Sequence, residues 1–233
     1  MGAFWSVINP LGHLLLYTFV FNIILKVRFS SDPSTANFAL YLMTGLLPWS
    51  AISESLSRAT TAVLEVPNLV KRVVFPLEIL PVVVALSSLS SALLAFVALV
   101  IFAAVSMHGL NWTIIYLPLV IFSQLLFMVG MSWFLASLGV YIRDIRHLIS
   151  LFLSAWMYTT PIVYPATSFP AHLKWLLVVN PAAGVVGDYR RVLLQGLAPD
   201  WSLYSVYTLL GVLLCTAGYH FFYKTKRSFA DVM

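Results

Sequence analysis

The chain has 233 residues, of which 61% are hydrophobic and 9% are charged, and its mean hydropathy is +0.95. Soluble domains contain about 25% charged residues, so this composition excludes a soluble protein and indicates an integral membrane protein. The formal net charge of +5 does not indicate nucleic-acid binding, because the cations lie in short segments between apolar runs, where they set membrane topology.

Six apolar runs are long enough to cross a bilayer, which requires about 20 mostly apolar residues. The chain is therefore predicted to be all-α, with spans over residues 7–25, 37–57, 79–106, 112–138, 147–164 and 202–223. The single cysteine, Cys215, lies in the last of these runs, so the sequence offers no disulfide framework and no thiol motif.

Polar and aromatic residues form a stripe along three of the predicted spans. The stripe of the first span contains Asn9, His13, Tyr17 and Phe21. The stripe of the second contains Ser50, Ser53, Glu54, Ser57 and Thr61. The stripe of the fifth contains His147, Ser150, Ser154, Tyr158 and Pro161. Each stripe alone fits an ordinary helix–helix contact, whereas the three together favour a wet cavity suited to sugar hydroxyls and pyranose faces.

A short amphipathic helix is predicted over residues 67–75, between the second and third spans. Its apolar positions follow the 3.6-residue repeat of one helix face, and Pro67 and Pro76 suit its start and its end. The opposite face carries Asn68, Lys71, Arg72 and Phe75. An aromatic ring beside two cations is typical of an anchor for a partner protein, but the pattern also fits an interfacial loop that packs on its own chain.

The segment 165–201 is predicted to fold back at one membrane surface. Its apolar runs, 173–179 and 182–194, are too short to span, and Asn180-Pro181 separates them. Charged residues that would be costly in mid-bilayer are Lys174, Asp188, Arg190 and Arg191. We therefore expect two short re-entrant helices over about 171–195. The aromatic residues expected to hold them at the surface are Trp175, Tyr189 and Trp201.

The distribution of Lys and Arg predicts the topology. With the N-terminus inside, the inner segments carry 8 of the 13 cationic residues and the outer segments carry 5. This bias places both termini and the helix 67–75 in the cytosol, and the re-entrant pair on the outer side. A seventh span through 165–201 would reverse the bias, so the distribution disfavours it.

Several motifs of catalysis and metal binding are missing from the sequence. It has no GxxxxGK[ST] loop, no HExxH motif, no Cys/His cluster and no GxSxG elbow. The chain is therefore predicted to bind no ATP through a P-loop and to hold no metal. Glu54 is the one acidic residue within a predicted span, and it is spaced for an ion pair with Arg58, so a carboxylate relay for ion-coupled transport is poorly supported.

Four stretches together resemble the ABC-2 type permeases, and most closely the branch that exports O-antigen, capsule and teichoic acid. The most specific is GLLPWSAISESLSRATTAVLEVPNLVKRVVFPLEILP at 45–81. The others are VYIRDIRHL at 140–148, YTTPIVYP at 158–165 and the Asn180-Pro181 pair. The resemblance covers nearly the whole chain. It implies a homodimer of six-span subunits in the bacterial plasma membrane, with a continuous pore for a lipid-linked polysaccharide or polyol phosphate polymer.

The same resemblance implies a role for particular residues. A separate ATPase chain, which binds ATP and Mg, would contact the cytosolic coupling helix 67–75 through Asn68, Lys71, Arg72 and Phe75. The pair at 171–195 would form an outer gate with Trp175, Asn180, Pro181 and Tyr189. The family's pore aromatics would correspond to Tyr17, Phe21, Trp156 and Tyr158. With them, the substrate path would include Asn9, His13 and Ser154.

Two other functions fit a protein with several membrane spans. A membrane-embedded glycosyl or phosphoryl transferase would require acidic or histidine clusters at a membrane surface, and the sequence offers none. A non-transporting scaffold would need neither polar stripes in three spans nor broken helices at the outer face. We therefore expect a transport subunit and not an enzyme.

Overall fold

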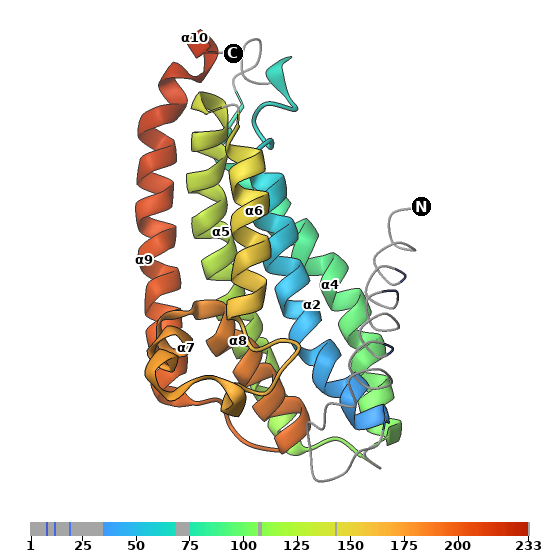
Figure 1. Ribbon diagram of the computed structural model, residues 1–233. Coiled ribbons are helices and arrows are strands. Elements are labelled where there is room, and N and C mark those ends of the chain that lie inside the picture. Colours follow the sequence, from blue (N-terminus) through green and yellow to red (C-terminus); the bar gives the residue numbers. More distant parts are fainter. Residues whose placement is uncertain are drawn as a thin grey trace. The chain divides into compact units, whose positions relative to one another are not determined.

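The computed structural model of the chain describes residues 8, 12, 19, 35–68, 75–106, 109–142 and 144–232 (Figure 1). Within these ranges the elements of regular structure are all helices, as the all-α prediction expects. The first predicted span, 7–25, lies almost wholly outside them. The chain divides into two compact units. One contains Met1–Ser50, Ser91–Val120 and Met157–Tyr204, and the other contains Ala51–Ser90, Ile121–Trp156 and Ser205–Met233.

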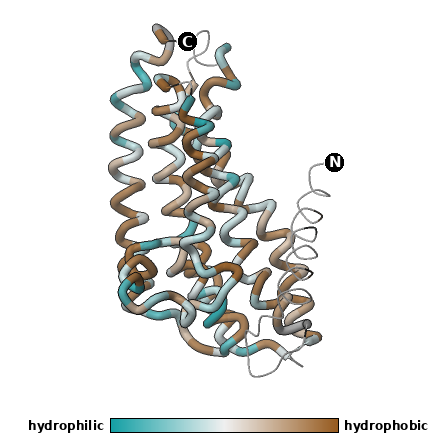
Figure 2. Tube along the Cα trace, in the orientation of Figure 1, coloured by the Kyte–Doolittle hydropathy of each residue, from teal (hydrophilic) through white to brown (hydrophobic). Residues whose placement is uncertain are grey.

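Three stretches of the described chain are long and apolar enough to cross a membrane. They are α4 (Ile79–Ser106), η2 (Trp112–Tyr116) continued by α5 (Leu117–Tyr141), and α9 (Trp201–Thr225) continued by η6 (Lys226–Ser228). Figure 2 shows the apolar colour that dominates α9. The bounds of α4 are those predicted for the third span, and the spans predicted at 112–138 and 202–223 lie within the other two stretches.

The other two long helices of the described chain are α2 (Thr35–Ala59) and α6 (Ile145–Thr159). α2 has 25 residues, with Pro48 inside it. α6 has 15 residues and ends before position 164, where the fifth span was predicted to end. The ring of Pro161 disfavours helical backbone at Thr160, so the helix stops just before that pair.

In the first unit, the chain after α6 forms a series of short helices. They are η3 (Ala166–Ser168), η4 (Ala171–Leu173), α7 (Trp175–Val179), α8 (Pro181–Arg190) and the π-helical η5 (Arg191–Gln195). α7 contacts α8, and η5 contacts η2. The predicted interruption at Asn180-Pro181 is the place where α7 ends and α8 begins. Gly196 follows η5 with a φ of +65°, the left-handed conformation that commonly ends a helix.

In the second unit, α5 and α9 pack with their backbones in contact. A Cβ on Gly130 would lie 2.6 Å from the backbone nitrogen of Cys215, and a Cβ on Gly218 would collide with the carbonyl oxygen of Gly130. Small residues allow such close approach in spans, where helices associate through tight packing. α2 joins α5 through a hydrogen bond of 3.1 Å between the hydroxyls of Ser55 and Ser132.

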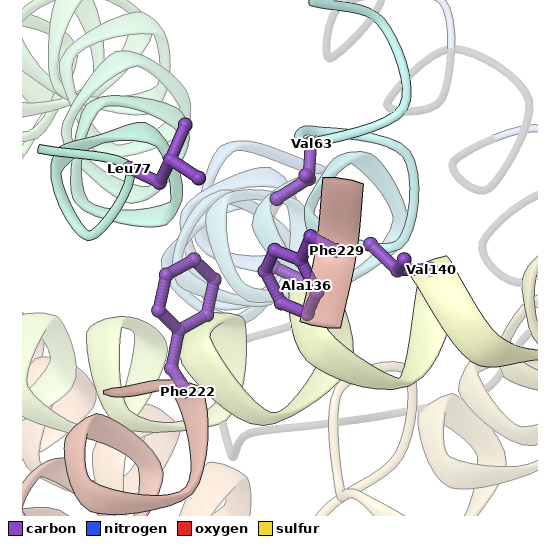
Figure 3. Close-up of a cluster of buried hydrophobic side chains, with 6 residues drawn as sticks. All are labelled: Val63, Leu77, Ala136, Val140, Phe222 and Phe229. Carbon is purple, nitrogen blue, oxygen red and sulfur yellow. The ribbon is translucent and has the colours of Figure 1, made fainter. Parts of the chain in front are cut away.

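The second unit also contains a buried apolar cluster (Figure 3). Its members are Val63, Leu77, Ala136, Val140, Phe222 and Phe229. Phe229 begins the last short helix, α10 (Phe229–Val232), and its side chain is 0% exposed. The cluster therefore connects both ends of the α2–α4 connection with α5, α9 and the C-terminal segment.

Candidate functional site

The chain leaves α6 as a buried, irregular segment, residues 160–164. Thr160 and Ile162 are 0% exposed, and Val163 is also buried. Irregular backbone within a membrane protein needs hydrogen-bond partners inside the protein, because lipid offers none. Side chains from α2 and α8 provide these partners.

Arg190, the last residue of α8, donates to this irregular segment. Its Nη1 lies 2.5 Å from the carbonyl oxygen of Pro161, and its Nη2 lies 2.8 Å from that of Ile162. The same nitrogens lie 2.9 Å from the hydroxyl and 3.2 Å from the carbonyl oxygen of Tyr41. The guanidinium carbon lies 3.6 Å from the centre of the Tyr41 ring. Arg190 is 5% exposed, so these contacts hold a buried cation.

The charge of Arg190 is balanced without a carboxylate. No ion pair involves Arg190 among the residues that the structure describes. Its partners are carbonyl oxygens just beyond the C-terminal end of α6, where the helix dipole is negative. Gly45 leaves room for the guanidinium, because a Cβ there would lie 2.8 Å from Nη2. The planar fork of arginine reaches several acceptors at once, which a lysine ammonium cannot do in this geometry.

Asn180 makes a second link between α8 and the end of α6. Its Oδ1 accepts from the backbone N–H groups of Ala182 at 3.0 Å and Ala183 at 3.3 Å, which caps α8. Its Nδ2 donates to the hydroxyl of Thr160 at 3.0 Å. Pro181 occupies the first position of α8, where the missing N–H costs nothing. The Asn180-Pro181 pair therefore both starts α8 and fastens it to α6.

Hydrogen bonds also hold η5, the last of the short helices that follow α6. The Nε of Arg191 donates to the carbonyl oxygen of Ala198 at 2.9 Å. The hydroxyl of Thr113 donates to the carbonyl oxygen of Val192 at 2.7 Å, which joins η2 to η5. These contacts join η5 to η2 and to the connection that leads into α9.

Asp200 caps the start of α9. Its Oδ1 accepts from the hydroxyl of Ser202 at 2.6 Å and from the backbone N–H of the same residue at 3.2 Å. The Ser202 hydroxyl holds the pKa of Asp200 below its usual range. The backbone N–H of Asp200 donates in turn to the buried carboxylate of Asp188 at 2.8 Å, so the cap is continuous with α8.

The aromatic residues expected at the membrane surface have different surroundings. Trp175 is 58% exposed, and Trp201 is 52% exposed and lies edge-on to Tyr116. Tyr189 is 2% exposed and lies edge-on to Phe96, with 5.2 Å between ring centres. Trp175 and Trp201 therefore have the exposure of surface anchors, whereas Tyr189 fills the interior of the first unit.

α6 makes few contacts with its own chain. Leu153 is its one buried residue, and every residue of this helix lies in the described part of the chain. The polar face exposes His147, Ser150, Ser154 and Tyr158, and the next face exposes Leu148, Leu151 and Phe152. Tyr158 is 70% exposed, whereas Trp156 is partly buried between Phe127 and Phe152. Ser154 and Tyr158 therefore share an exposed face, and Trp156 does not lie on it.

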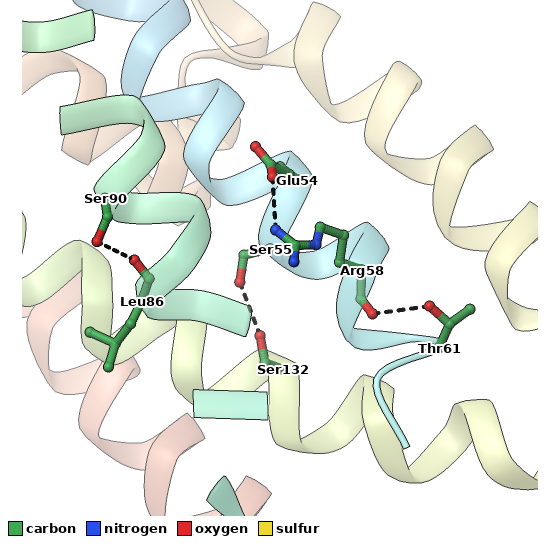
Figure 4. A network of polar contacts seen from close by, with 7 residues as sticks. All are labelled: Glu54, Ser55, Arg58, Thr61, Leu86, Ser90 and Ser132. Atoms are coloured by element: carbon green, nitrogen blue, oxygen red, sulfur yellow. Dashed lines mark hydrogen bonds and ion pairs between the residues drawn. The ribbon is translucent and has the colours of Figure 1, made fainter. Parts of the chain in front are cut away.

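α2 also exposes a polar face (Figure 4). The predicted ion pair is confirmed, because Nη1 of Arg58 lies 3.0 Å from Oε1 of Glu54. Both side chains are nearly half exposed, and Thr61 bonds to the carbonyl oxygen of Arg58. In contrast, Ser55 of the same helix is fully buried. The exposed face of α2 therefore carries charge, and its buried face carries a packing hydroxyl.

The predicted coupling helix is described at its ends alone. Asn68 is exposed and helical, and Phe75 is partly buried against the cluster of Figure 3. Lys71 and Arg72 lie outside the described residues, as do Asn9, His13, Tyr17 and Phe21 of the first predicted span. The ring of Phe75 is therefore partly covered by its own chain, and its contact with an ATPase stays a prediction.

The model of the ABC-2 type transporter family matches residues 1–190. The chain belongs to the ABC-2 type transporter family. As a member it is an integral membrane transport component and not an enzyme, and its family implies an ABC ATPase as partner. The segments described above, from α2 to the end of α8, lie within the matched range.

Curated relatives extend the likeness to the whole chain. One is the O-antigen export system permease protein RfbA of Klebsiella pneumoniae, which is 27% identical over 237 residues, covering 100% of this chain and 87% of the relative. Another is the protein of the same name from Myxococcus xanthus, 25% identical over 233 residues, covering 99% of this chain and 87% of the relative. The chain is thus similar to these permeases along nearly its full length.

Sequence reasoning missed two residues of the site in this ABC-2 transporter chain, Arg190 and Tyr41. Arg190 was noted as a charge that the bilayer disfavours, which is itself a sign of function in a membrane protein. Its partner could not be named, because Tyr41 lies 149 residues earlier in the chain. Asn180 was found because an Asn-Pro pair between two apolar runs has a local meaning.

Proposed function

We propose that the chain is the permease subunit of an exporter that moves a lipid-linked polysaccharide of the O-antigen kind, or a related polyol phosphate polymer, across the bacterial plasma membrane. The names of its full-length relatives support this substrate class. Two copies of the chain enclose the path in this proposal. A separate ATPase chain binds ATP and Mg, and this chain needs no cofactor of its own.

The exposed polar face of α6 is the observation that carries the proposal. A helix that contacts lipid exposes apolar side chains, because polar groups without partners are costly in hydrocarbon. The face with His147, Ser154 and Tyr158 suits a watery path. Hydroxyl groups exchange hydrogen bonds with sugar hydroxyls, and the ring of Tyr158 stacks on a pyranose face. The exposed Glu54–Arg58 pair of α2 also suits a polar path better than lipid.

The second exposed face of α6 supports a homodimer. Leu148, Leu151 and Phe152 are each more than half exposed in the single chain, and they adjoin the polar face on the same helix. A second copy that covers this apolar face would leave the polar faces of both copies on a shared path. Isologous pairing of this kind is the commonest symmetry of homo-oligomers.

The topology in this proposal has six spans and both termini in the cytosol. The spans are the segment 7–25, α2, α4, η2 with α5, α6 continued by the irregular segment 160–164, and α9. The helix 67–75 then lies on the cytosolic side and couples to the ATPase, and the short helices from 171 to 195 form an outer gate. The excess of Lys and Arg in the inner segments supports this orientation.

Truncation of Tyr158 tests the substrate path. We expect Tyr158→Ala to lower export of the surface glycan by about two- to tenfold per inserted subunit, because a ring contact is lost. Phe122→Ala is the matched control, since this ring of α5 is also exposed, at 55%. Tyr17→Ala is tested in parallel for the first span. Export that falls only in step with protein abundance would assign Tyr158 to packing.

Charge reversal tests the coupling helix. We expect Lys71→Glu combined with Arg72→Glu to abolish co-purification with the ATPase chain while the spans stay inserted, because an acidic groove would repel the new charges. Normal co-purification together with normal export would reject the coupling assignment.

Deletion of the gene should make the lipid-linked glycan accumulate in the cytosolic leaflet, and analysis of that glycan identifies the substrate.

Cysteine labelling tests the outer gate in a Cys215→Ser background. We expect Ala171→Cys and Leu197→Cys to react with a membrane-impermeant thiol reagent from outside intact cells, and Gly184→Cys to react more weakly. Leu197 is chosen over Gly196, because the φ of +65° at Gly196 disfavours any other residue. Labelling of positions 171 and 197 from opposite sides of the membrane would show a full crossing and reject the six-span topology.

A further inference from the structure

The C-terminal segment is packed into the second unit. After α9 the chain forms η6 and α10, and Phe229 at the start of α10 is fully buried. The ring of Phe229 lies edge-on to Phe222, with 5.4 Å between ring centres, and contacts Tyr141 of α5 at 6.0 Å. A tail that served only to place cations in the cytosol would not bury an aromatic ring.

Phe229 belongs to the cluster of Figure 3, which also contains a residue from each end of the α2–α4 connection. Val63 lies just before the predicted coupling helix, and Leu77 lies just after it. Phe75, the last residue of that helix as predicted, packs against the cluster as well. The segment that bears the coupling helix therefore starts and ends on residues that share one cluster with Phe229.

Polar contacts fix the position of the tail beside this cluster. Lys226 forms an ion pair with Glu78, and the two side chains are 25% and 15% exposed. The backbone oxygen of Glu78 also accepts from Nε1 of Trp133 at 2.9 Å. These contacts join the residue that precedes α4 to α5 and to the tail.

Further hydrogen bonds hold the junction of α9 and η6 to α5. The hydroxyl of Tyr141 donates to the carbonyl oxygen of Thr225 at 3.0 Å, and the hydroxyls of Thr225 and Ser137 are 3.1 Å apart. The tail is thus fastened on one side to α5 and on the other to the start of α4.

We propose that Lys226 and Phe229 are positioning residues for ATP-driven transport, and that the C-terminal segment clamps the α2–α4 connection to α5 and α9. The inference rests on the proposed role of the helix 67–75 as the contact for the ATPase. A displacement of that helix moves the spans only if the residues before and after it are held rigidly to the spans. The clamp makes the start of α4 and the end of α9 move together with the connection.

A charge exchange tests the clamp. We expect Glu78→Lys and Lys226→Glu, each alone, to retain the ATPase chain on co-purification but to lower export per inserted subunit by about fivefold or more, while ATP hydrolysis continues. The double exchange, Glu78→Lys with Lys226→Glu, should recover most of the export. A double variant that exports no better than the single variants, at equal amounts in the membrane, would overturn the proposal.

Truncation of Phe229 tests whether its ring is needed for the clamp. Phe229→Ala should lower export per inserted subunit while the ATPase chain stays bound, and Phe229→Leu should retain most of the export. Val232→Ala is the matched control, because Val232 lies in the same short helix and is 48% exposed. If Phe229→Ala lowers export only in step with the amount inserted, the ring supports the fold and not the coupling.

Cross-linking tests the clamp without removing the ring. In a Cys215→Ser background, Glu78→Cys and Lys226→Cys are joined by a short bifunctional thiol reagent in inverted vesicles that contain the ATPase. Both cysteine changes remove the ion pair, so the clamp predicts low ATP-driven transport before joining and higher transport after it. Transport that stops on joining would show that the tail must release the connection and would overturn a permanent clamp. If the reversal at Lys71 and Arg72 leaves ATPase binding intact, the coupling role of the helix fails. If that reversal acts and the clamp variants do not, the clamp alone fails.

Discussion

The short helices that follow α6 and the segment that follows α9 are held by different sets of contacts. The first region is fastened by polar side chains on backbone oxygens, with Arg190 and Asn180 reaching the end of α6. The second is fastened by the ring of Phe229 in an apolar cluster and by the ion pair of Lys226 with Glu78. The difference follows from the backbone, since the irregular segment 160–164 has buried carbonyl groups that lack helical partners. The cluster of Figure 3 brings together apolar side chains and has no such need.

The largest effect is expected at Arg190. Arg190→Met should lower the free energy of unfolding by about 3 kcal/mol or more, because at least two buried carbonyl oxygens lose their donors. Thermal unfolding of the purified subunit in detergent measures this loss. Arg190→Lys should be nearly as damaging, whereas Phe229→Leu in the apolar region should cost less than about 1.5 kcal/mol. Equal tolerance of both conservative changes would contradict the contrast between the two regions.

A smaller effect is expected at Asn180. Asn180→Ala should cost about 1–2 kcal/mol, because the cap of α8 and the bond to Thr160 are both lost. Asn180→Asp is the informative control, since it keeps the capping oxygen and removes the Nδ2 donor. An Asp variant as unstable as the Ala variant would show that the link to α6 matters more than the cap.

Acid should loosen the contact between the tail and the residue that precedes α4. Burial alone would raise the pKa of Glu78, but its hydrogen bonds and the charge of Lys226 outweigh burial and hold the pKa below its usual range. A carboxylate with a depressed pKa stabilises the fold at neutral pH, and this contribution is lost as the pH falls through its folded-state pKa. We expect acid to raise proteolysis after α9, and Glu78→Gln to remove that dependence. Proteolysis of the wild type that does not change with pH would contradict this role.

The smallest effect is expected at the exposed pair of α2. Glu54→Gln should change the free energy of unfolding by less than about 1 kcal/mol, because both partners are nearly half exposed in the chain. If this face lines the path, Glu54→Gln should lower export per inserted subunit even though the free energy of unfolding hardly changes. A loss of stability as large as that of Asn180→Ala would place the pair in a buried contact.

Local patterns predicted the parts of the fold that depend on neighbours in sequence. The bounds of α4 follow from an uninterrupted apolar run, and the Glu54–Arg58 pair follows from helix geometry at i, i+4. The interruption at Asn180-Pro181 follows from the chemistry of that pair. In each case the residues that decide the structure lie within a few positions of one another.

Long-range packing decided the parts that the sequence could not predict. The tail reads as a polar segment, and the burial of Phe229 depends on Val63 and Leu77, more than 150 residues away. Tyr189 was expected at the membrane surface, and the ring of Phe96 covers it instead. The cluster also covers part of Phe75, a contact that the local pattern does not specify. An amphipathic pattern shows that a face will be covered, but it does not identify the neighbour that covers it.

The meagre intrachain contact of α6 has a consequence for biosynthesis. A helix of 15 residues that carries His147 and several hydroxyls is a weak signal for the insertion machinery, which releases strongly apolar segments of about 20 residues into lipid most readily. We expect α6 to enter the membrane late, after α5 has emerged and as a hairpin with it. A subunit that finds no partner would leave this helix as the first target of membrane proteases. Overproduction of this chain alone should therefore yield a short-lived protein whose half-life lengthens when the other chains of the transporter are made with it.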